Sequence, residues 1–263
     1  MKTLSLSWKE RFSGVSRVYG EAALSLFSKK HICVIGIGGV GSWVAEALAR
    51  SGIGMLTLID MDDVCISNTN RQIHATKKNL GKPKIQVMAE RILEINPECD
   101  VTYVDDFITV SNAPMLLDNN FSYVIDAIDS VTAKAALLAW CRRNNTPVIT
   151  IGGAGGQIDP LQIQVSDLTK TIQDPLAASL RDQLKHNFNI LPNSKGKLNI
   201  DCVFSSECLR YLQKDGSISN SRGNMKNQKT IDCKNGLGTV MMVTATFGLI
   251  SVSHIFKKML YNA

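Results

Sequence analysis

Residues 31–52 contain the feature that most limits the possible folds, a glycine-rich turn between an apolar run and an amphipathic segment. The run HICVIGI predicts a buried strand, and GSWVAEALARSG has the apolar spacing of a helix that Gly52 ends. Between them, Gly36, Gly38 and Gly41 have the G-x-G-x-x-G spacing that places a phosphate at a helix N-terminus. This turn alone does not distinguish NAD from ATP.

The alternation of strand and helix patterns continues to about residue 165. Further strands are predicted at 55–60, 101–107, 121–129, 147–153 and 161–168, and helices at 84–97 and 134–144. Helices of this length between strands form right-handed crossovers, which give a largely parallel sheet covered on both faces. The sequence therefore predicts an α/β fold that is Rossmann-like and doubly wound, with a mostly parallel sheet.

Composition divides the chain into three consecutive parts of one domain. A chain of 263 residues that is 44% hydrophobic can bury one sizeable core, so we expect a single domain over 1–263. Its parts are a nucleotide-binding core at 10–165, a loop-rich substrate region at 170–235 and an apolar helix at 236–260. Residues 181–230 hold nine Lys or Arg against four Asp or Glu, which favours an anionic partner.

The substrate region and the apolar run carry more local expectations. A short helix is expected near 174–187, β structure near 202–212 and a mobile loop over 214–230. The run 236–256 is nearly uncharged and long enough for a membrane span. Because its polar residues would be distributed around the helix and no second span occurs, we interpret it as a buried or dimer-interface helix of a soluble homodimer.

The cysteines bear on location and on metal binding. The chain has seven cysteines, an odd number, and no secretory signal, so we expect reduced thiols and a cytoplasmic protein. Association with a membrane through 236–256 is the alternative. No C-x-x-C pair occurs, so no structural zinc is expected.

An acidic residue and several cations follow the glycine turn. Asp60 stands 19 residues beyond Gly41, at the end of the second predicted strand, where an acid holds ribose hydroxyls. Arg71 and Lys84 come next; a nicotinamide cofactor needs no such cations, whereas the leaving pyrophosphate of ATP does. Asp129, at the end of the fourth predicted strand, is the natural ligand for magnesium. These residues together describe an adenylating site.

Several other residues have two interpretations. Asp126 either supports the magnesium ligand or caps the following helix. His74 follows the cation stretch, and packing at a helix end is favoured over contact with substrate. His254 is expected to be a hydrogen-bonded core histidine, and Trp43 and Trp140 are expected to lie in the core.

Five short stretches, GIGGVG, LIDMD, SNTNRQ, GKPK and DAIDS, occur in an order and spacing that match a known family. They resemble the adenylating enzymes that activate ubiquitin and its bacterial relatives in molybdopterin and thiamin synthesis, and the resemblance covers about residues 10–165. It implies that the nucleotide is held by a defined set of residues. The triphosphate would pass Gly36, Gly38, Gly39 and Gly41, the ribose would lie at Asp60 with Asp62 nearby, Asn68 and Arg71 would bind phosphates, Lys84 the α-phosphate and Asp129 the magnesium.

Residues 151–177 and 201–207 narrow the resemblance to a branch of the family that modifies tRNA. This implies ATP-dependent dehydration of N6-threonylcarbamoyladenosine at position 37 of tRNA, in which a ring closes on an acyl adenylate. The alternative is adenylation of the C-terminus of a small sulfur-carrier or ubiquitin-like protein. An NAD-dependent oxidoreductase is a third class, but no His or Tyr-x-x-x-Lys arrangement for hydride transfer is present.

The resemblance also concerns partners and cysteines. In relatives an N-terminal arginine of the partner subunit reaches the site, and Arg17 is preferred over Arg11 for this role. Cys233 is preferred over Cys202 and Cys208 as a catalytic thiol, although a spare thiol is favoured because ring closure within the substrate needs no enzyme nucleophile. The expected partners are tRNA, a second copy of the chain, and a cysteine desulfurase with its sulfur-acceptor protein.

Overall fold

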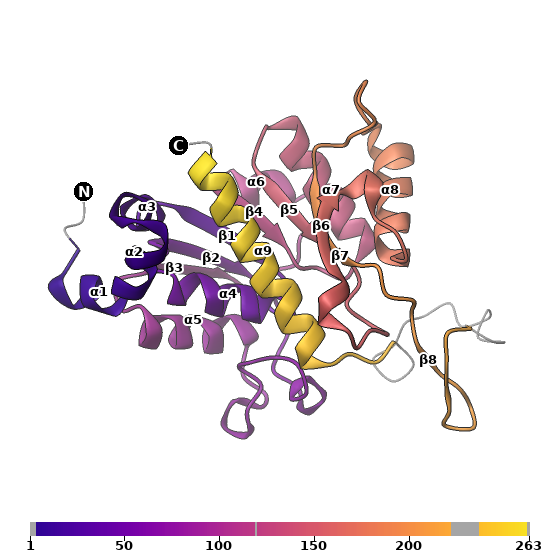
Figure 1. Ribbon diagram of the computed structural model, residues 1–263, viewed down its shortest axis with the longest axis horizontal. Helices are drawn as coiled ribbons and strands as arrows, with labels where there is room; N and C mark the ends of the chain where they lie inside the picture. Colours follow the sequence, from indigo (N-terminus) through magenta and orange to yellow (C-terminus); the bar gives the residue numbers. More distant parts are fainter. Residues whose placement is uncertain (1–3, 119, 222–236, 262–263) are drawn as a thin grey trace.

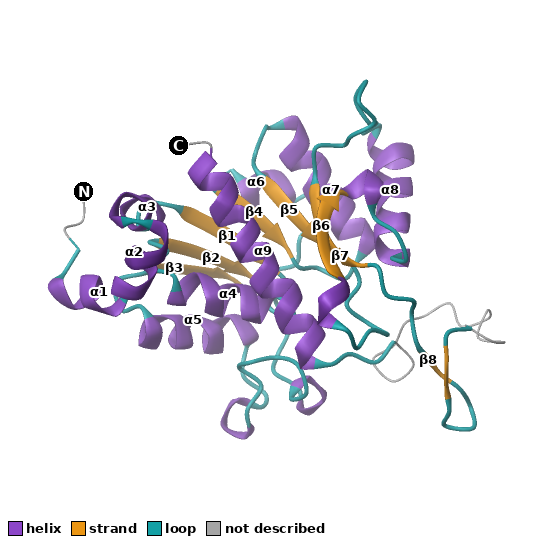
Figure 2. Cartoon of the chain, viewed as in Figure 1, coloured by secondary structure: helices purple, strands orange, loops and turns teal. Residues whose placement is uncertain are grey.

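A seven-stranded sheet forms the centre of the computed structural model, which describes residues 4–118, 120–221 and 237–261. The strands are β1 His31–Ile35, β2 Met55–Ile59, β3 Asp100–Val104, β4 Tyr123–Asp126, β5 Val148–Ile151, β6 Ile163–Asp167 and β7 Asp201–Ser205. Their order is β3-β2-β1-β4-β5-β7-β6, and all neighbours are parallel except β6 and β7 (Figure 2). The predicted Rossmann-like, mostly parallel sheet is confirmed.

Helices cover both faces of this sheet. They are α1 Leu6–Arg11, α2 Ser13–Tyr19, α3 Glu21–Phe27, α4 Gly41–Arg50, α5 Lys84–Ile95, α6 Ala113–Leu117, α7 Val131–Arg143, α8 Pro175–Phe188 and α9 Met241–Tyr261. One core lies between the sheet and α4, α5 and α9, and the other between the sheet and α6, α7 and α8. Neighbouring strand residues such as Val34 and Ile35 enter opposite cores, which explains the continuous apolar runs of the sequence.

The N-terminal helices lie at the amino edge of the sheet, where the parallel strands begin (Figure 1). Helix α3 runs directly into β1, and α2 packs on α3. Trp8, Phe12 and Leu24 pack closely around Gly52 at the end of α4, because a Cβ there would lie 3.1–3.2 Å from their side chains. The opposite edge, where the parallel strands end, is called the carboxyl edge below.

The C-terminal helix α9 crosses in front of the sheet (Figure 1). It approaches α4 closely, since a Cβ on Gly248 would lie 3.0 Å from the carbonyl oxygen of Val40. Near its other end, Phe256 stacks on Phe27 with ring centroids 4.2 Å apart. The expected buried apolar helix is confirmed, with its start at Met241. Among the described residues no helix is long and apolar enough to span a membrane.

Residues 170–221 are more ordered than their composition predicts. Helix α8 and strand β7 confirm the expected helix and β structure. The expected loop after residue 213 is wrong in its first part, because β8 Tyr211–Leu212 and β9 Ile218–Ser219 form a hairpin. Gly216, with φ +84°, closes its turn, and the Asp-Gly pair there is a hairpin signal. Residues 222–236 lie outside the described structure.

Candidate nucleotide-binding site

The turn after β1 is built from backbone approaches that only glycine allows. Gly36 has φ +86°, and a Cβ there would lie 2.7 Å from the carbonyl oxygen of Ala127 in the turn after β4. A Cβ on Gly41 would lie 1.8 Å from the carbonyl oxygen of Gly36, inside any possible contact. The turns after β1 and β4 are therefore packed against each other, and α4 begins directly beside them. The first backbone N–H groups of a helix are the groups that bind phosphate.

Asp60 connects this glycine turn to the end of β2. Its Oδ2 accepts a hydrogen bond from the backbone N–H of Ile37 at 2.6 Å, and its Oδ1 accepts one from the N–H of Asp62 at 2.8 Å. Burial raises the pKa of the Asp60 carboxyl, while the positive charge of Lys84 and the two hydrogen bonds act in the opposite direction. Asp60 thus fixes the turn at the predicted ribose position, with one lone pair on each oxygen still available for a hydroxyl.

Lys84 and Asp62 form an ion pair at the mouth of the site. Lys84 is the first residue of α5 and is buried, with its Nζ 2.6 Å from Asp62 Oδ2. The side chain of Asp62 is 56% exposed, so the pair lies at the boundary between protein and solvent. A phosphate group at this position can replace the carboxylate of Asp62 as the partner of the ammonium group.

Arg71 lies over the glycine turn. A Cβ on Gly39 would be 3.1 Å from Cγ and Cδ of Arg71, so the absence of a side chain at Gly39 makes room for the arginine. The guanidinium of Arg71 donates a hydrogen bond to the carbonyl oxygen of Ser67 at 2.8 Å. The backbone carbonyl oxygen of Arg71 accepts a hydrogen bond from Nε1 of Trp43 at 2.9 Å. Asn68 is buried and accepts the N–H of Cys65 through Oδ1, which holds the short helix that precedes Arg71.

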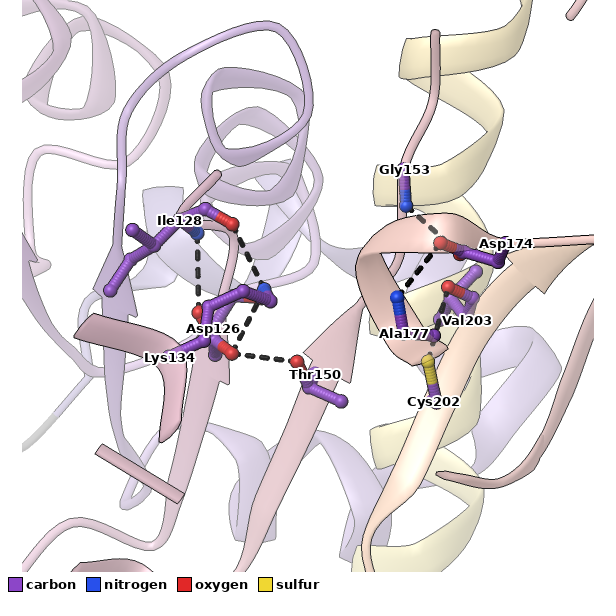
Figure 3. Close-up of polar contacts among 9 residues, drawn as sticks. All are labelled: Asp126, Ile128, Lys134, Thr150, Gly153, Asp174, Ala177, Cys202 and Val203. Carbon is purple, nitrogen blue, oxygen red and sulfur yellow. Dashed lines mark hydrogen bonds and ion pairs between the residues drawn. The ribbon is translucent and has the colours of Figure 1, made fainter. Parts of the chain in front are cut away.

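The two aspartates of the DAIDS stretch have different surroundings, and Figure 3 shows those of Asp126. Asp129 is exposed, after the end of β4. Asp126 is fully buried and pairs with Lys134, and its expected support of the magnesium ligand stays a prediction. It does not cap α7, because Ser130 is the N-cap residue and makes no side-chain cap hydrogen bond. The sequence did not identify Lys134, although a lysine within the apolar stretch KAALLAW is a signal for a buried cation.

His74 is confirmed as a packing residue and lies close to the site cations. It is 1% exposed, and among the described residues neither ring nitrogen has a hydrogen-bond partner. Burial, together with the positive charges of Lys84 and Arg91, lowers the pKa of the imidazole to about 4. The ring is therefore neutral at pH 7 and adds no charge beside Lys84. Gln72, also buried, leaves its Oε1 without a partner in the same part of the structure.

Residues expected at helix ends or in the core have mixed outcomes. Trp140, a residue of α7, is half-buried and packs against the core between this helix and the sheet. Trp43 is half-buried and hydrogen-bonded to the backbone of Arg71. His254 is hydrogen-bonded as expected, since its Nε2 lies 2.8 Å from Oδ2 of Asp201, but it is half-buried rather than in the core.

The candidate cysteines and the N-terminal arginine lie away from the glycine turn or outside the described residues. Cys202 is fully buried in β7, and burial raises the pKa of its thiol far above the usual range, which is the opposite of what a nucleophile needs. Cys208 is exposed, and Cys233 lies outside the described residues. Arg17 is exposed on α2 at the amino edge, at the other end of the sheet from its own chain's Gly36.

The substrate region is attached to the carboxyl edge beside this site. The backbone N–H of Arg210 donates to the carbonyl oxygen of Gly156 at 2.8 Å, and Gly156 in turn donates to the carbonyl oxygen of Gly238. The carboxylate of Glu207 accepts hydrogen bonds from the N–H groups of Ile158 and Asp159. The glycine-rich turn after β5 therefore connects the nucleotide-binding strands to residues 207–210.

The pattern of the ThiF family matches residues 13–262. The chain belongs to the ThiF family. It is 61% identical to the tRNA threonylcarbamoyladenosine dehydratase of Escherichia coli strain K12, over 99% of this chain and 97% of that protein. It is 34% identical to the protein of the same name from Bacillus subtilis strain 168, over 95% of this chain and 94% of that one.

Solved structures of ThiF-type proteins have the same fold throughout. One described as TcdA (CsdL) is 59% identical, with a TM-score of 0.94 over 100% of this chain and 98% of that chain. The Escherichia coli tRNA N6-threonylcarbamoyladenosine dehydratase in complex with ATP is 58% identical, with a TM-score of 0.89 over 99% of this chain and 98% of that chain. The same enzyme has been solved in complex with AMP, at 59% identity and a TM-score of 0.90, over 100% of this chain and 98% of that chain.

Proposed function

We propose that this chain catalyses the ATP-dependent dehydration of N6-threonylcarbamoyladenosine at position 37 of tRNA. The observation that carries the proposal is the similarity, over nearly the whole chain, to dehydratases of this name, one of which has been solved with ATP. The chain also has the glycine turn, Asp60, Arg71, Lys84 and Asp129 at one edge of the sheet. Family membership, the fold and the site geometry all support an ATP-dependent adenylating enzyme.

The reaction has two steps that together remove one water. The carboxylate of the threonylcarbamoyl group attacks the α-phosphorus of ATP, which forms an acyl adenylate and releases pyrophosphate. The carbamoyl group then attacks the activated carbonyl, the carbonyl–AMP bond breaks, and AMP leaves with the former carboxylate oxygen while the carbamoyl group loses a proton. Because the second step is intramolecular, proximity provides much of its rate and no enzyme thiol is required.

The cations at the carboxyl edge suit the first step. Lys84 and Arg71 would stabilise the charge that develops on the α-phosphate and the leaving pyrophosphate, which is the largest contribution in phosphoryl-type transfer. In this proposal Lys84 leaves Asp62 when the nucleotide binds. Asp60 and Asn68 would orient the ribose and phosphates through groups already held by backbone hydrogen bonds.

Asp129 fits the magnesium ion that accompanies ATP. Its carboxylate is exposed at the carboxyl edge, and no ion pair or hydrogen bond from another described residue competes for it. Mg²⁺ in nucleotide sites is held by one or two carboxylates together with phosphate oxygens and water, so a single aspartate is enough. When bound, the ion neutralises phosphate charge. No group of three or more metal-binding side chains exists among the described residues.

We propose that the substrate region binds the tRNA backbone. Exposed lysines in its described part are Lys170, Lys185, Lys195, Lys197 and Lys214. Lys214 follows Arg210, whose backbone N–H is bonded to Gly156 at the carboxyl edge. Lys197, in contrast, lies near the beginnings of β5 and β7 at the amino edge. Lysines that contact phosphate release counterions, so such binding weakens with salt. Recognition of one nucleoside within a folded RNA requires contacts of this kind outside the small nucleotide site.

We further propose a homodimer. Helix α9 exposes Met241, Met242 and Leu249 beside its buried face, and Leu161 is 92% exposed, which favours a partner surface over these residues. Arg17 lies too far along the sheet to serve its own site, so its predicted role requires a second copy. Association with a cysteine desulfurase and its sulfur-acceptor protein stays a prediction, as does a sulfur-accepting role for Cys233.

Pyrophosphate exchange tests the proposed function directly. Purified protein with ATP and Mg²⁺ should exchange pyrophosphate when given tRNA that carries N6-threonylcarbamoyladenosine, and not when given tRNA without the modification. A small sulfur-carrier protein is the second arm. Exchange that depends on the carrier and not on the modified tRNA would overturn the proposal in favour of carrier activation.

A further inference from the structure

A charged pair without solvent contact lies under the turn that carries Asp129. Lys134 and Asp126 are both 0% exposed, and Nζ of Lys134 lies 2.9 Å from Oδ2 of Asp126. The hydroxyl of Thr150, on the neighbouring strand β5, donates to the same carboxylate oxygen at 2.6 Å (Figure 3). Removing two charges from water is costly, and a well-packed apolar pair is often at least as stable. The pair therefore calls for an explanation other than stability.

Both backbone groups of Ile128 are held by this pair. Its N–H donates to Oδ1 of Asp126 at 3.2 Å, and its carbonyl oxygen accepts from Nζ of Lys134 at 2.9 Å. Ile128 is the residue directly before Asp129. On its other side, the N–H of Ala127 donates to the carbonyl oxygen of Ile35, and the turn packs against Gly36. Turn 127–129 cannot shift without breaking hydrogen bonds to charged groups in a low-dielectric interior, where unpaired charges are costly.

A buried carboxylate holds the next turn along the same edge in a similar way. Asp174 accepts hydrogen bonds from the N–H of Gly153 at 3.0 Å and from the N–H of Ala177 at 2.9 Å. A Cβ on Gly152 would lie 1.9 Å from the carboxylate of Asp174, so only glycine fits at this position. Buried charge under successive turns is thus a repeated feature of the carboxyl edge.

We infer that Lys134 and Asp126 are positioning residues, which fix turn 127–129 and thereby the place of the Asp129 carboxylate beside the glycine turn. Neither side chain reaches solvent, so neither contacts the substrate or the nucleotide. The inference rests on the proposed function, in which Asp129 binds the magnesium ion that accompanies ATP. A purely structural role for the pair is the competing explanation, and it predicts a loss of stability without a local effect on the turn.

A matched pair of threonine variants separates these two explanations. Thr150→Val removes the hydrogen bond to Asp126, whereas Thr57→Val removes an equally buried hydroxyl that bonds His31 at the amino edge. We expect both to lower Tm by a similar amount. Only Thr150→Val should speed amide hydrogen exchange at residues 127–130, by about tenfold or more, because exchange reports local opening. Only Thr150→Val should also lower kcat for pyrophosphate release, by a factor of about 10 to 100, with KM for tRNA unchanged.

Two further variants keep the test decisive. Asp126→Asn with Lys134→Met removes both charges together and should fold, because no unpaired charge is left, yet it should show the fast exchange and low kcat of a turn without its Lys134 donor. Unchanged exchange at 127–130 in both Thr150→Val and this double variant would overturn the inference. Asp129→Asn tests the proposed function separately, because full turnover of this variant would contradict the catalytic role of Asp129. Amide hydrogen exchange at residues 127–130 would still test whether Lys134 and Asp126 fix the turn.

Discussion

The nucleotide side of the site, residues 36–41 and 126–129, and the substrate side, residues 207–221, are held in different ways. On the nucleotide side the turns are fixed by glycine contacts and by buried charges, so the backbone has one available arrangement. On the substrate side most residues of 211–221 are exposed, and in the described part of the chain β8 and β9 pair with no other strand. A triphosphate is a small, highly charged ligand, whereas a folded RNA is a broad surface. The difference indicates that preorganisation is concentrated where bonds are made and broken.

The largest expected effect comes from removing charge on the nucleotide side. Asp129→Asn and Arg71→Ala should each keep the fold and lower ATP-dependent turnover by about a hundredfold or more, because each loses charge stabilisation in the transition state. The double variant should lose little more, since both act on the same pyrophosphate charge. Pyrophosphate release with saturating modified tRNA measures this. Full turnover of Asp129→Asn, or strictly multiplicative losses, would contradict the shared role.

Charge reversal on the substrate side should have a smaller effect that is confined to RNA binding. Arg210→Glu with Lys214→Glu, next to the carboxyl edge, should raise KM for tRNA by about tenfold while the affinity for ATP stays the same, because only phosphate contacts are lost. Lys9→Glu with Lys29→Glu makes the same change of charge at the amino edge and serves as the control.

Salt titrations sharpen the same test. For the unmodified protein, the log-log slope of tRNA binding against salt should indicate roughly three to six phosphate contacts. The slope should fall in the Arg210 and Lys214 variant and stay the same in the control. Parallel slopes in all three proteins would show that this region does not contact RNA.

The buried His74, close to Lys84, should make the stability of the folded protein depend on pH. Its pKa of about 4 in the folded protein is below the usual 6.5, so the unfolded chain binds the proton more readily. The stability gained from the neutral ring is complete above pH 6.5 and is lost as the pH falls toward 4. The shift corresponds to about 3 kcal/mol over that window. Urea denaturation at several pH values measures it.

The control for this effect is the exposed His186 on α8. His74→Leu should flatten the dependence of unfolding free energy on pH between 6.5 and 4, while His186→Gln should leave the dependence unchanged. An equal slope in His74→Leu and the unmodified protein would contradict the assignment of the effect to His74.

The smallest effect is expected at Cys233. Because the ring closes within the substrate, Cys233→Ser should keep substantial dehydratase activity and lose only sulfur acceptance at that position. Mass spectrometry of the protein during turnover provides the check. A thioester on Cys233 that turnover requires would reverse this expectation.

The sequence predicted those features that depend on local pattern. The strands, the glycine spacing and the cations after Asp60 could be located because each follows from neighbouring residues, although β3, β4 and β5 end two or three residues before the predicted ends. The partner of Asp126 could not, since Lys134 and Thr150 reach it only after β4, α7 and β5 have packed. The antiparallel direction of β6 likewise depends on its pairing with β7 rather than on its own residues. The turn of the β8–β9 hairpin was readable from Asp215-Gly216, although the polar composition around it suggested a loop.

Helix α9 has a consequence for how the protein is made. It is the last described element, yet it packs on α4, and just before it the carbonyl oxygen of Thr239 accepts a hydrogen bond from Asn70 beside Arg71. During synthesis, α4 and the strands under it therefore leave the ribosome with an apolar face that residues 241–261 cover in the folded protein. Until those residues have been added, that face is open to aggregation or to a chaperone, and the loop around Arg71 lacks one of its supports. The nucleotide side, although encoded early, becomes complete late.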